Sequence, residues 1–484
     1  MTLARSAGWV LVAASGILFF SVPVADNDLW GHLYFGRDIL DAAALPRVNG
    51  YSYTAPTYPW INHEIVAECV FAAVYGLCGP TGLVILKVAM GLATLGLMAR
   101  TVRVRTDDWI ALTLTLVLAA SMMSFGYLVR PQIFTFLFTA TMWHCLITEL
   151  RTSSARGLAL LPPLFAVWIN THGGVMAGMA LLFVVSGLRF ATGGRLHAAI
   201  LLACVAALLV NPYGIELPTF LIEDLSKSRA ISEWQSIPVL GMANLQFKIA
   251  FALVVLGVFG ATRRDVPELV PVILVGLATF RHERHLPLFA IVAAPHVAVT
   301  ISRLTTVLTR GRNLELSTAA ATLVAAAMLA IATVQVRGAF RLWRAVDFGI
   351  FVSPAQFPIE AVATIKRQQL RGNLAVPFDW GEYAIWHLYP DCRVSIDGRY
   401  TTAYPDDVIR QSWTFVAAEP GWDAPLREAS IALVGAAQAA RRKLASDPEW
   451  AEIHSDSTAC VFVRRGTRFI PSAVRAAPIP PSFP

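Results

Sequence analysis

Apolar segments recur at short intervals along the first two thirds of the chain, and polar turns separate them. A helix of about 20 apolar residues spans the hydrocarbon core of a bilayer. The pattern therefore predicts an α-helical polytopic membrane protein with about eleven transmembrane helices. The predicted helices lie near residues 8–25, 82–99, 109–126, 132–148, 158–170, 174–190, 197–211, 247–262, 267–280, 286–302 and 318–336.

The composition agrees with this prediction. Of the 484 residues, 56% are hydrophobic and 15% are charged, and the mean hydropathy of +0.57 excludes an ordinary soluble domain. The arginines behind the formal net charge of +7 cluster in turns between apolar segments. That distribution is typical of membrane topology signals and does not indicate nucleic-acid binding.

A shorter apolar run at residues 65–78 contains Glu68 and stops at Gly79-Pro80, so it either crosses the membrane or lies in its interface. Positive residues favour the cytoplasmic side. If this run does not cross, thirteen arginines face the cytoplasm and seven basic residues face the other side; a crossing would reverse the bias. We therefore expect an interfacial helix. The first group is Arg5, Arg100, Arg103, Arg105, Arg151, Arg156, Arg189, Arg195, Arg263, Arg264, Arg303, Arg310 and Arg312, and the second is Arg37, Arg47, Arg130, Lys227, Arg229, Arg281 and Arg284.

This orientation predicts two domains. A transmembrane domain covers residues 1–336 and has a long first extracytoplasmic loop, 26–80; residues 337–484 form a small extracytoplasmic α/β domain. In the latter, a strand, a turn at 379–381, a helix to Leu388 and a strand at 393–396 give a β-α-β pattern. Segments 430–434 and 458–464 could add strands, and 435–445 a helix. Cys392 and Cys460 are the cysteines that could form a disulfide there.

The N-terminus allows two interpretations. Arg5, the apolar run and Pro23-Val24-Ala25 loosely resemble a cleavable signal peptide. The apolar run is long for a signal peptide, and cleavage would free the first loop from its anchor. We therefore expect a retained helix.

The first loop carries the strongest chemical signal. It opens with DNDLWGHLYFGRDIL, which places Asp26, Asp28 and His32 where the chain leaves the membrane, and it ends with His63 and Glu64. Each cluster begins an amphipathic stretch, and carboxylates beside a bilayer are costly unless they are used. Alternatively, Asp26 and Asp28 only cap the helix that starts near residue 29.

Other outer turns carry polar residues at helix ends, notably Arg130, His172, Arg281 and Arg284. The positive-inside rule disfavours the two arginines of the RHERH turn unless they have an anionic partner. A guanidinium binds phosphate oxygens in a bidentate manner, so a phosphate is the attractive partner. Snorkelling to lipid headgroups is the alternative.

Together these features resemble the GT-C superfamily of membrane glycosyltransferases, which includes oligosaccharyltransferase catalytic subunits, protein O-mannosyltransferases and aminoarabinose transferases. DNDLWGH and WINHE occupy the places of that family's acidic first-loop motif and its flanking interfacial helices. The chain also resembles a group of bacterial membrane proteins with D-x-W-x-H, R-P-Q, N-x-H-G, N-P-x-G and R-H-x-R blocks.

The resemblance implies transfer of a sugar from a polyprenyl-phosphate-linked donor to a glycan, lipid or protein acceptor, at the outer face of a bacterial inner membrane. It implies that Asp28, Asp26 or Glu64 acts as base, with Asp28 as a candidate ligand for a divalent metal such as Mg or Mn. The implied substrate-binding residues are His32, His63, Arg130, His172, Arg281 and Arg284.

Two other functions remain open at this point. A ligase or polymerase of lipid-linked glycans would also depend on outward arginines and histidines. A transporter or flippase would place ionisable residues near the middle of the membrane, often with an inverted repeat. Here the ionisable residues gather on one face, which favours the transferase.

Overall fold

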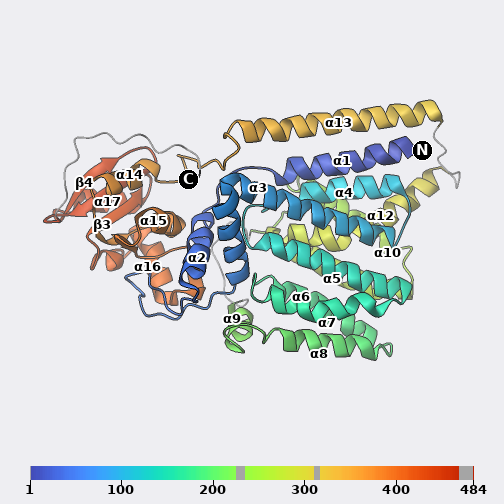
Figure 1. The fold of residues 1–484 in the computed structure, drawn as a ribbon, viewed down its shortest axis with the longest axis horizontal. Helices are drawn as coiled ribbons and strands as arrows, with labels where there is room; N and C mark the ends of the chain where they lie inside the picture. Colours follow the sequence, from blue (N-terminus) through green and yellow to red (C-terminus); the bar gives the residue numbers. More distant parts are fainter. Residues whose placement is uncertain (1, 225–234, 310–316, 468–482, 484) are drawn as a thin grey trace. The chain divides into compact units, whose positions relative to one another are not determined.

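A computed structural model describes residues 2–224, 235–309, 317–467 and 483. Lys227, Arg229, Arg310 and Arg312 of the topology prediction lie outside these ranges. The chain divides into two compact units, which we call the helical unit (Met1–Val22 and Val84–Asp347) and the mixed unit (Pro23–Leu83 and Phe348–Pro484) (Figure 1).

The helical unit contains a helix at each of the eleven predicted apolar segments. α1 packs between α13 and α4, and α12 packs against α4, α5, α10 and α11 (Figure 1). The bounds are α1 (Thr2–Phe20), α3 (Ile65–Arg103, shared with the mixed unit), α4 (Trp109–Met123), α5 (Gln132–Thr152), α6 (Leu161–Trp168), α7 (Val175–Phe190), α8 (Arg195–Ala207), α9 (Glu216–Asp224), α10 (Leu245–Val258), α11 (Val266–Arg281), α12 (Leu286–Leu308) and α13 (Thr318–Arg344).

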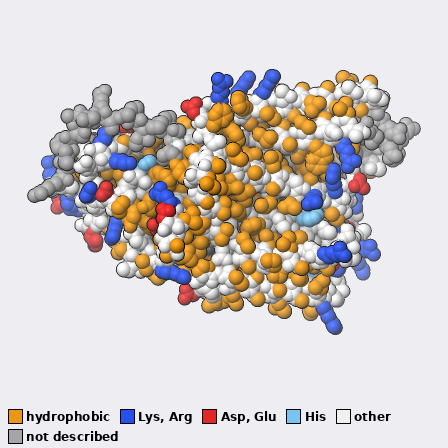
Figure 2. All heavy atoms as spheres, viewed as in Figure 1, with side chains coloured by type: hydrophobic (Ala, Val, Ile, Leu, Met, Phe, Trp, Pro, Cys, Tyr) orange, Lys and Arg blue, Asp and Glu red, His pale blue; other side chains and the backbone are white. Residues whose placement is uncertain are grey.

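Five helices among the described residues are long and apolar enough to cross a membrane, by length and composition: Thr2–Phe20, Ile65–Arg103, Gln132–Thr152, Glu283–Leu308 and Thr318–Arg344. Five shorter apolar helices accompany them. Hydrophobic side chains cover much of the visible face of these helices (Figure 2). The prediction of a multi-pass helical fold is confirmed at this level, whereas the number of crossings and their orientation stay predictions.

The mixed unit contains a five-stranded sheet of order β2-β1-β3-β5-β4. β1 pairs in parallel with β2 and β3, and the remaining pairs are antiparallel. The strands are β1 (Gly372–Ala375), β2 (Cys392–Val394), β3 (Ile431–Gly435), β4 (Trp450–Ser455) and β5 (Ala459–Arg464), and the helices of the C-terminal part are α14 (Ile359–Arg367), α15 (Gly381–Leu388), α16 (Asp406–Ala417) and α17 (Ala439–Ser446).

The sheet confirms the predicted β-α-β pattern, because α15 connects the parallel strands β1 and β2. The predicted strands at 430–434 and 458–464 correspond to β3 and β5. The sequence analysis did not identify β4, α14 or α16. Cys392 and Cys460 are buried free thiols, so they do not form the disulfide considered above.

The first loop is part of the mixed unit. The backbone amide of Tyr53 donates to the carbonyl of Val394 at 3.1 Å. The amide of Val394 donates to the carbonyl of Tyr51, also at 3.1 Å. The Tyr53 ring lies in the same hydrophobic cluster as Phe415 and Trp450. The loop is therefore held at the edge of the sheet.

Two helices of this unit begin where the sequence places the polar clusters. α2 (Leu29–Ala42) follows Asp28, and α3 starts at Ile65, directly after Glu64. The helical geometry of α3 breaks at Gly79, whose φ of 60° is accessible to glycine. The break lies at the predicted end of the 65–78 segment.

Candidate active site

Asp28 occupies the N-cap of α2, but its side chain makes no capping hydrogen bond. Instead, its backbone amide donates to Asp26 Oδ1 at 3.1 Å, and its carbonyl accepts from the amide of His32 at 3.0 Å. The geometry therefore does not support the view that the Asp28 carboxylate only caps the helix.

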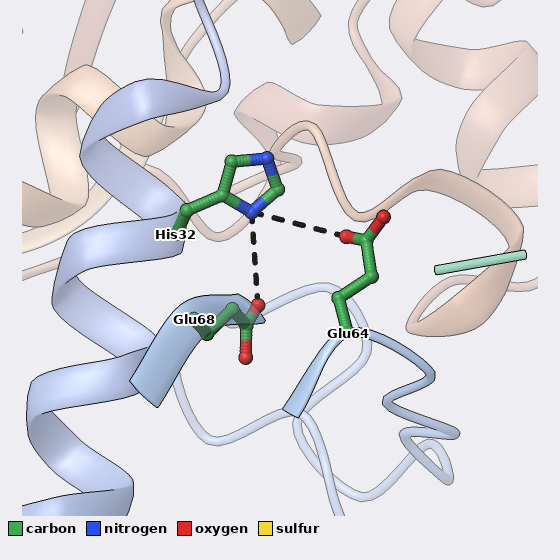
Figure 3. Close-up of side chains that lie close together, drawn as sticks. All are labelled: His32, Glu64 and Glu68. Carbon is green, nitrogen blue, oxygen red and sulfur yellow. Dashed lines mark ion pairs between the residues drawn. The ribbon is translucent and has the colours of Figure 1, made fainter. Parts of the chain in front are cut away.

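His32, Glu64 and Glu68 converge from the starts of α2 and α3 (Figure 3). His32 Nδ1 lies 3.8 Å from Glu64 Oε2 and 3.8 Å from Glu68 Oε1. One potential ligand atom from each residue lies within 4.8 Å of the others. We call these three residues the His–Glu triad. His32, its member on α2, lies one helical turn after Asp28.

Burial makes this triad electrostatically unusual. His32 is 7% exposed and Glu68 is 3% exposed. Burial lowers the pKa of His32, but the nearby carboxylates of Glu68, Glu64 and Asp28 outweigh it and raise the pKa. The triad therefore attracts positive charge, which a proton or a metal cation would supply.

Neighbouring side chains hold the two glutamates. Asn62 Nδ2 donates to Glu68 Oε2 at 2.6 Å, and the Glu64 amide donates to Asn62 Oδ1 at 2.8 Å. His63 Nε2 lies 3.6 Å from Glu64 Oε1. His63 is thus placed against the triad rather than within it.

The C-terminal part of the chain contributes a further carboxyl group, that of Glu382 on α15. Its Oε2 accepts a hydrogen bond from the amide of Gly31 at 3.2 Å. A Cβ atom added at Gly398 would lie 2.6 Å from Glu382 Oε1 and 3.0 Å from Asp28 Oδ1. Burial first, and then the charges of Asp28 and Asp397, raise the pKa of Glu382 well above its usual value.

Asp397 and Arg399, which follow β2, form a buried ion pair at 2.7 Å. The guanidinium carbon of Arg399 lies 4.5 Å from the ring centre of Trp60 and 4.9 Å from that of Tyr51. The guanidinium also donates a hydrogen bond to Asn49 Oδ1. These contacts attach the first loop to the C-terminal part.

The other predicted substrate-binding residues belong to the helical unit. His172 Nδ1 lies 2.8 Å from Thr135 Oγ1 and accepts from the amide of Gly174 at 3.1 Å. Arg130 lies two residues before the start of α5 and is half-buried. His172 therefore has a helix-start role in this unit, whether or not it also binds a substrate.

Arg281 is the last residue of α11 and is exposed, and Arg284 lies half-buried in the following 3₁₀ turn. Glu283, between them, accepts a hydrogen bond from Asn244 Nδ2 at 2.7 Å. Its amide donates to the carbonyl of Gln235 at 3.0 Å. Glu283 thus fixes the turn that presents both arginines.

Sequence reasoning missed Glu68 and Glu382 as site residues. Glu68 follows Glu64 by four positions, a spacing that places both on one helix face once a helix starts there. Glu382 had no comparable signal, because its partner Gly31 is 351 positions away.

Comparisons with known proteins bear on the fold. The sequence matches no family model and no curated protein. The structure is similar to ArnT from Cupriavidus metallidurans bound to undecaprenyl phosphate, with a TM-score of 0.55 and 13% identity over 95% of this chain and 97% of that one. Its fold is similar to that of GT-C glycosyltransferases.

The oligosaccharyltransferase of Archaeoglobus fulgidus is similar as well. Its apo form has a TM-score of 0.55 and 12% identity, covering 88% of this chain and 69% of that one. Its complex with Zn and sulfate has a TM-score of 0.54 and 12% identity, covering 88% and 68%. The resemblance inferred from the first loop is therefore confirmed for the fold.

Proposed function

We propose that this protein is a membrane glycosyltransferase that moves a sugar from a polyprenyl-phosphate-linked donor to an extracytoplasmic glycan, lipid or protein acceptor. The observation that carries the proposal is the His–Glu triad, built from the two helix starts of the first loop, with its His32 one helical turn after Asp28. The GT-C-like fold and the undecaprenyl phosphate bound by the similar ArnT structure support the class of donor.

Asp28 is the proposed base, with Asp26 and Glu64 as alternatives. It removes the proton from the acceptor nucleophile, which then bonds to the anomeric carbon of the sugar with inversion. The bond between that carbon and the phosphate oxygen breaks, and its electron pair leaves on the phosphate. Lipid phosphate is already a good leaving group, so the protein mainly deprotonates the acceptor and stabilises the departing charge.

The His–Glu triad is the proposed metal site in place of Asp28 alone. One imidazole and two carboxylates suit Zn or Mn better than Mg, which prefers all-oxygen ligands. A cation there would supply positive charge for binding the donor phosphate. The archaeal oligosaccharyltransferase complex with Zn and sulfate is compatible with such a donor set.

Arg281 and Arg284 are the proposed ligands of the lipid phosphate, and Arg130, His172, His32 and His63 are proposed to contribute to substrate binding. A bidentate guanidinium suits a phosphate oxygen pair. We also propose a bacterial inner-membrane location with the mixed unit on the extracytoplasmic side, as the arginine distribution predicts.

The proposal can be tested without knowing the acceptor. The detergent-purified protein is extracted with organic solvent, and the lipids are analysed by mass spectrometry beside an extract of the same membranes. We expect a polyprenyl phosphate, with or without a sugar, to be enriched over the bulk extract. Enrichment of ordinary phospholipids alone would contradict the proposed donor class.

A further inference from the structure

The N-terminus of α2 has an unusual source of capping. The first four backbone amides of a helix have no partner within the helix, and an Asp at the N-cap usually accepts from one of them. The Asp28 side chain does not do so. The amide of Leu29 donates to the carbonyl of Asp26 at 3.2 Å, and the amide of Gly31 donates to Glu382 Oε2.

The space around Glu382 is shaped for this contact. A Cβ atom at Gly31 would overlap the Glu382 carboxyl group, and one at Gly398 would lie 2.6 Å from its Oε1. A Cβ atom at Gly381 would overlap the carbonyl oxygen of Ile396. Three glycines thus allow the first turn of α2, the start of α15 and the 397–398 turn to approach one another closely.

The two helices that meet at Glu382, α2 and α15, are firmly packed. Glu382 is 5% exposed, and its neighbour Tyr383 makes an edge-to-face contact with Trp30 of α2 at 5.0 Å between ring centres. α15 also connects the parallel strands β1 and β2, which pair directly with each other. A carboxyl group held in this way can fix the direction in which α2 begins.

We propose that Glu382 is a positioning residue that caps α2 in place of Asp28, so that the Asp28 side chain does not serve as the cap of its own helix. The C-terminal part of the chain would then be required for the arrangement of the candidate active site. The capping itself does not depend on the proposed function; only its consequence for sugar transfer rests on it.

The first experiment compares Glu382→Gln, which keeps the acceptor oxygen, with Glu382→Met, which keeps the volume and removes it. Amide hydrogen exchange is measured on peptides covering residues 28–33 of the full-length protein in detergent. We expect exchange about 2- to 10-fold faster in the Met variant, because one net hydrogen bond is lost. In the Gln variant we expect near-normal exchange. Glu452→Gln on β4 is the matched control.

The second experiment asks whether Asp28 takes over the cap. Asp28→Ala is introduced into the wild type and into Glu382→Met, and the drop in Tm is compared. We expect a larger drop in the Glu382→Met background, because Asp28 would cap the helix there. Unchanged exchange in Glu382→Met, or equal Tm drops in both backgrounds, would overturn the inference.

A transfer assay separates this inference from the proposed function. It uses an undecaprenyl-phosphate-linked sugar and measures release of undecaprenyl phosphate. If transfer occurs, we expect Glu382→Met to lower kcat with little change in KM. Glu382→Gln should have a kcat near that of the wild type. Confirmed capping without any transfer would contradict the function and leave the capping intact; transfer that Glu382→Met leaves unchanged would overturn the positioning role.

Discussion

Asn62 and Glu68 form a hydrogen bond of 2.6 Å between the amide nitrogen of one and Oε2 of the other. The same Asn62 side chain accepts from the backbone amide of Glu64 at 2.8 Å. One amide group therefore orients one glutamate of the His–Glu triad and fixes the backbone of the other. Groups that orient metal ligands in this way contribute to affinity although they do not touch the metal.

Asn62→Ala is expected to weaken Zn or Mn binding about 10- to 100-fold, because Glu68 loses its orienting partner. Isothermal titration calorimetry with the metal alone measures this, after the purified protein has been treated with a chelator. Asn373→Ala serves as control, since Asn373 bonds only the carbonyl of Glu428 among the contacts seen for its side chain. Equal affinities in the wild type and Asn62→Ala would argue against the triad as the metal site.

Gly31→Ala should destabilise the protein, although Gly to Ala within a helix normally stabilises by about 0.5–1 kcal/mol. The added methyl group would overlap the Glu382 carboxyl group. Gly76→Ala on α3 is the matched control, because a Cβ atom there meets nothing within 4 Å. Thermal unfolding should show a lower Tm for Gly31→Ala and an equal or higher one for Gly76→Ala. A rise in Tm for both would mean that α2 and α15 are further apart.

A buried ion network in the helical unit gives a prediction for stability. Arg105 pairs with Glu268 and, at 2.9 Å, with Asp265, and Arg151 contacts both acids as well. Glu268 is fully buried. Arg105→Met should destabilise the fold by about 3 kcal/mol, because breaking a buried pair leaves uncompensated charge. Thermal unfolding checks this, and the exposed Arg156→Met should have little effect.

The sequence predicted the helical segments and the β-α-β unit well, because both leave a local signal. Apolar runs of about the same length identify the helices. The turn residues that begin at Asp379, followed by a helical segment that ends at Leu388, identify the β-α-β unit. β4 was missed because its residues do not alternate regularly between buried and exposed positions. Glu452 is exposed, for example, and the next residue, Ile453, is half-buried.

The candidate site was predicted only in part, because only some of its contacts join residues that are close in the sequence. Asp28, His32 and Glu64 stand at helix starts, so their positions could be read along the chain. Glu382 approaches Gly31 only after the first loop packs on the sheet, and no periodicity records such a contact. The sequence could also not show that Asp28 sits at a helix start without capping it.

Arg281 and Arg284 provide a test of the phosphate proposal. Changing either to Ala should weaken binding of undecaprenyl phosphate, and Lys should restore it only in part, because a single ammonium group lacks the bidentate fork. Binding can be measured by native mass spectrometry of the detergent-solubilised protein. Arg264→Ala, an exposed arginine of another turn, is the control. Unchanged binding in the double Ala variant would leave these residues as lipid-headgroup contacts.

Asp28→Asn tests the proposed base most directly. The Asp28 side chain makes no capping hydrogen bond, and Asn caps about as well as Asp, so Tm and protein yield should stay near those of the wild type. The substitution removes the proton acceptor, however, and loss of general-base catalysis is expected to lower the rate of transfer by about 10²- to 10⁴-fold. Release of undecaprenyl phosphate from an undecaprenyl-phosphate-linked sugar measures the rate.

Asp26→Asn and Glu64→Gln are made in parallel, because either acid is an alternative base. The variant whose rate falls while its metal affinity is kept identifies the base, since a lost triad ligand would lower both. Glu64→Gln should therefore reduce Zn or Mn binding as well as transfer, whereas Asp28→Asn should reduce transfer alone. Full transfer in all three variants would show that the acids of the first loop are structural, and the proposed chemistry would then have no base in this loop.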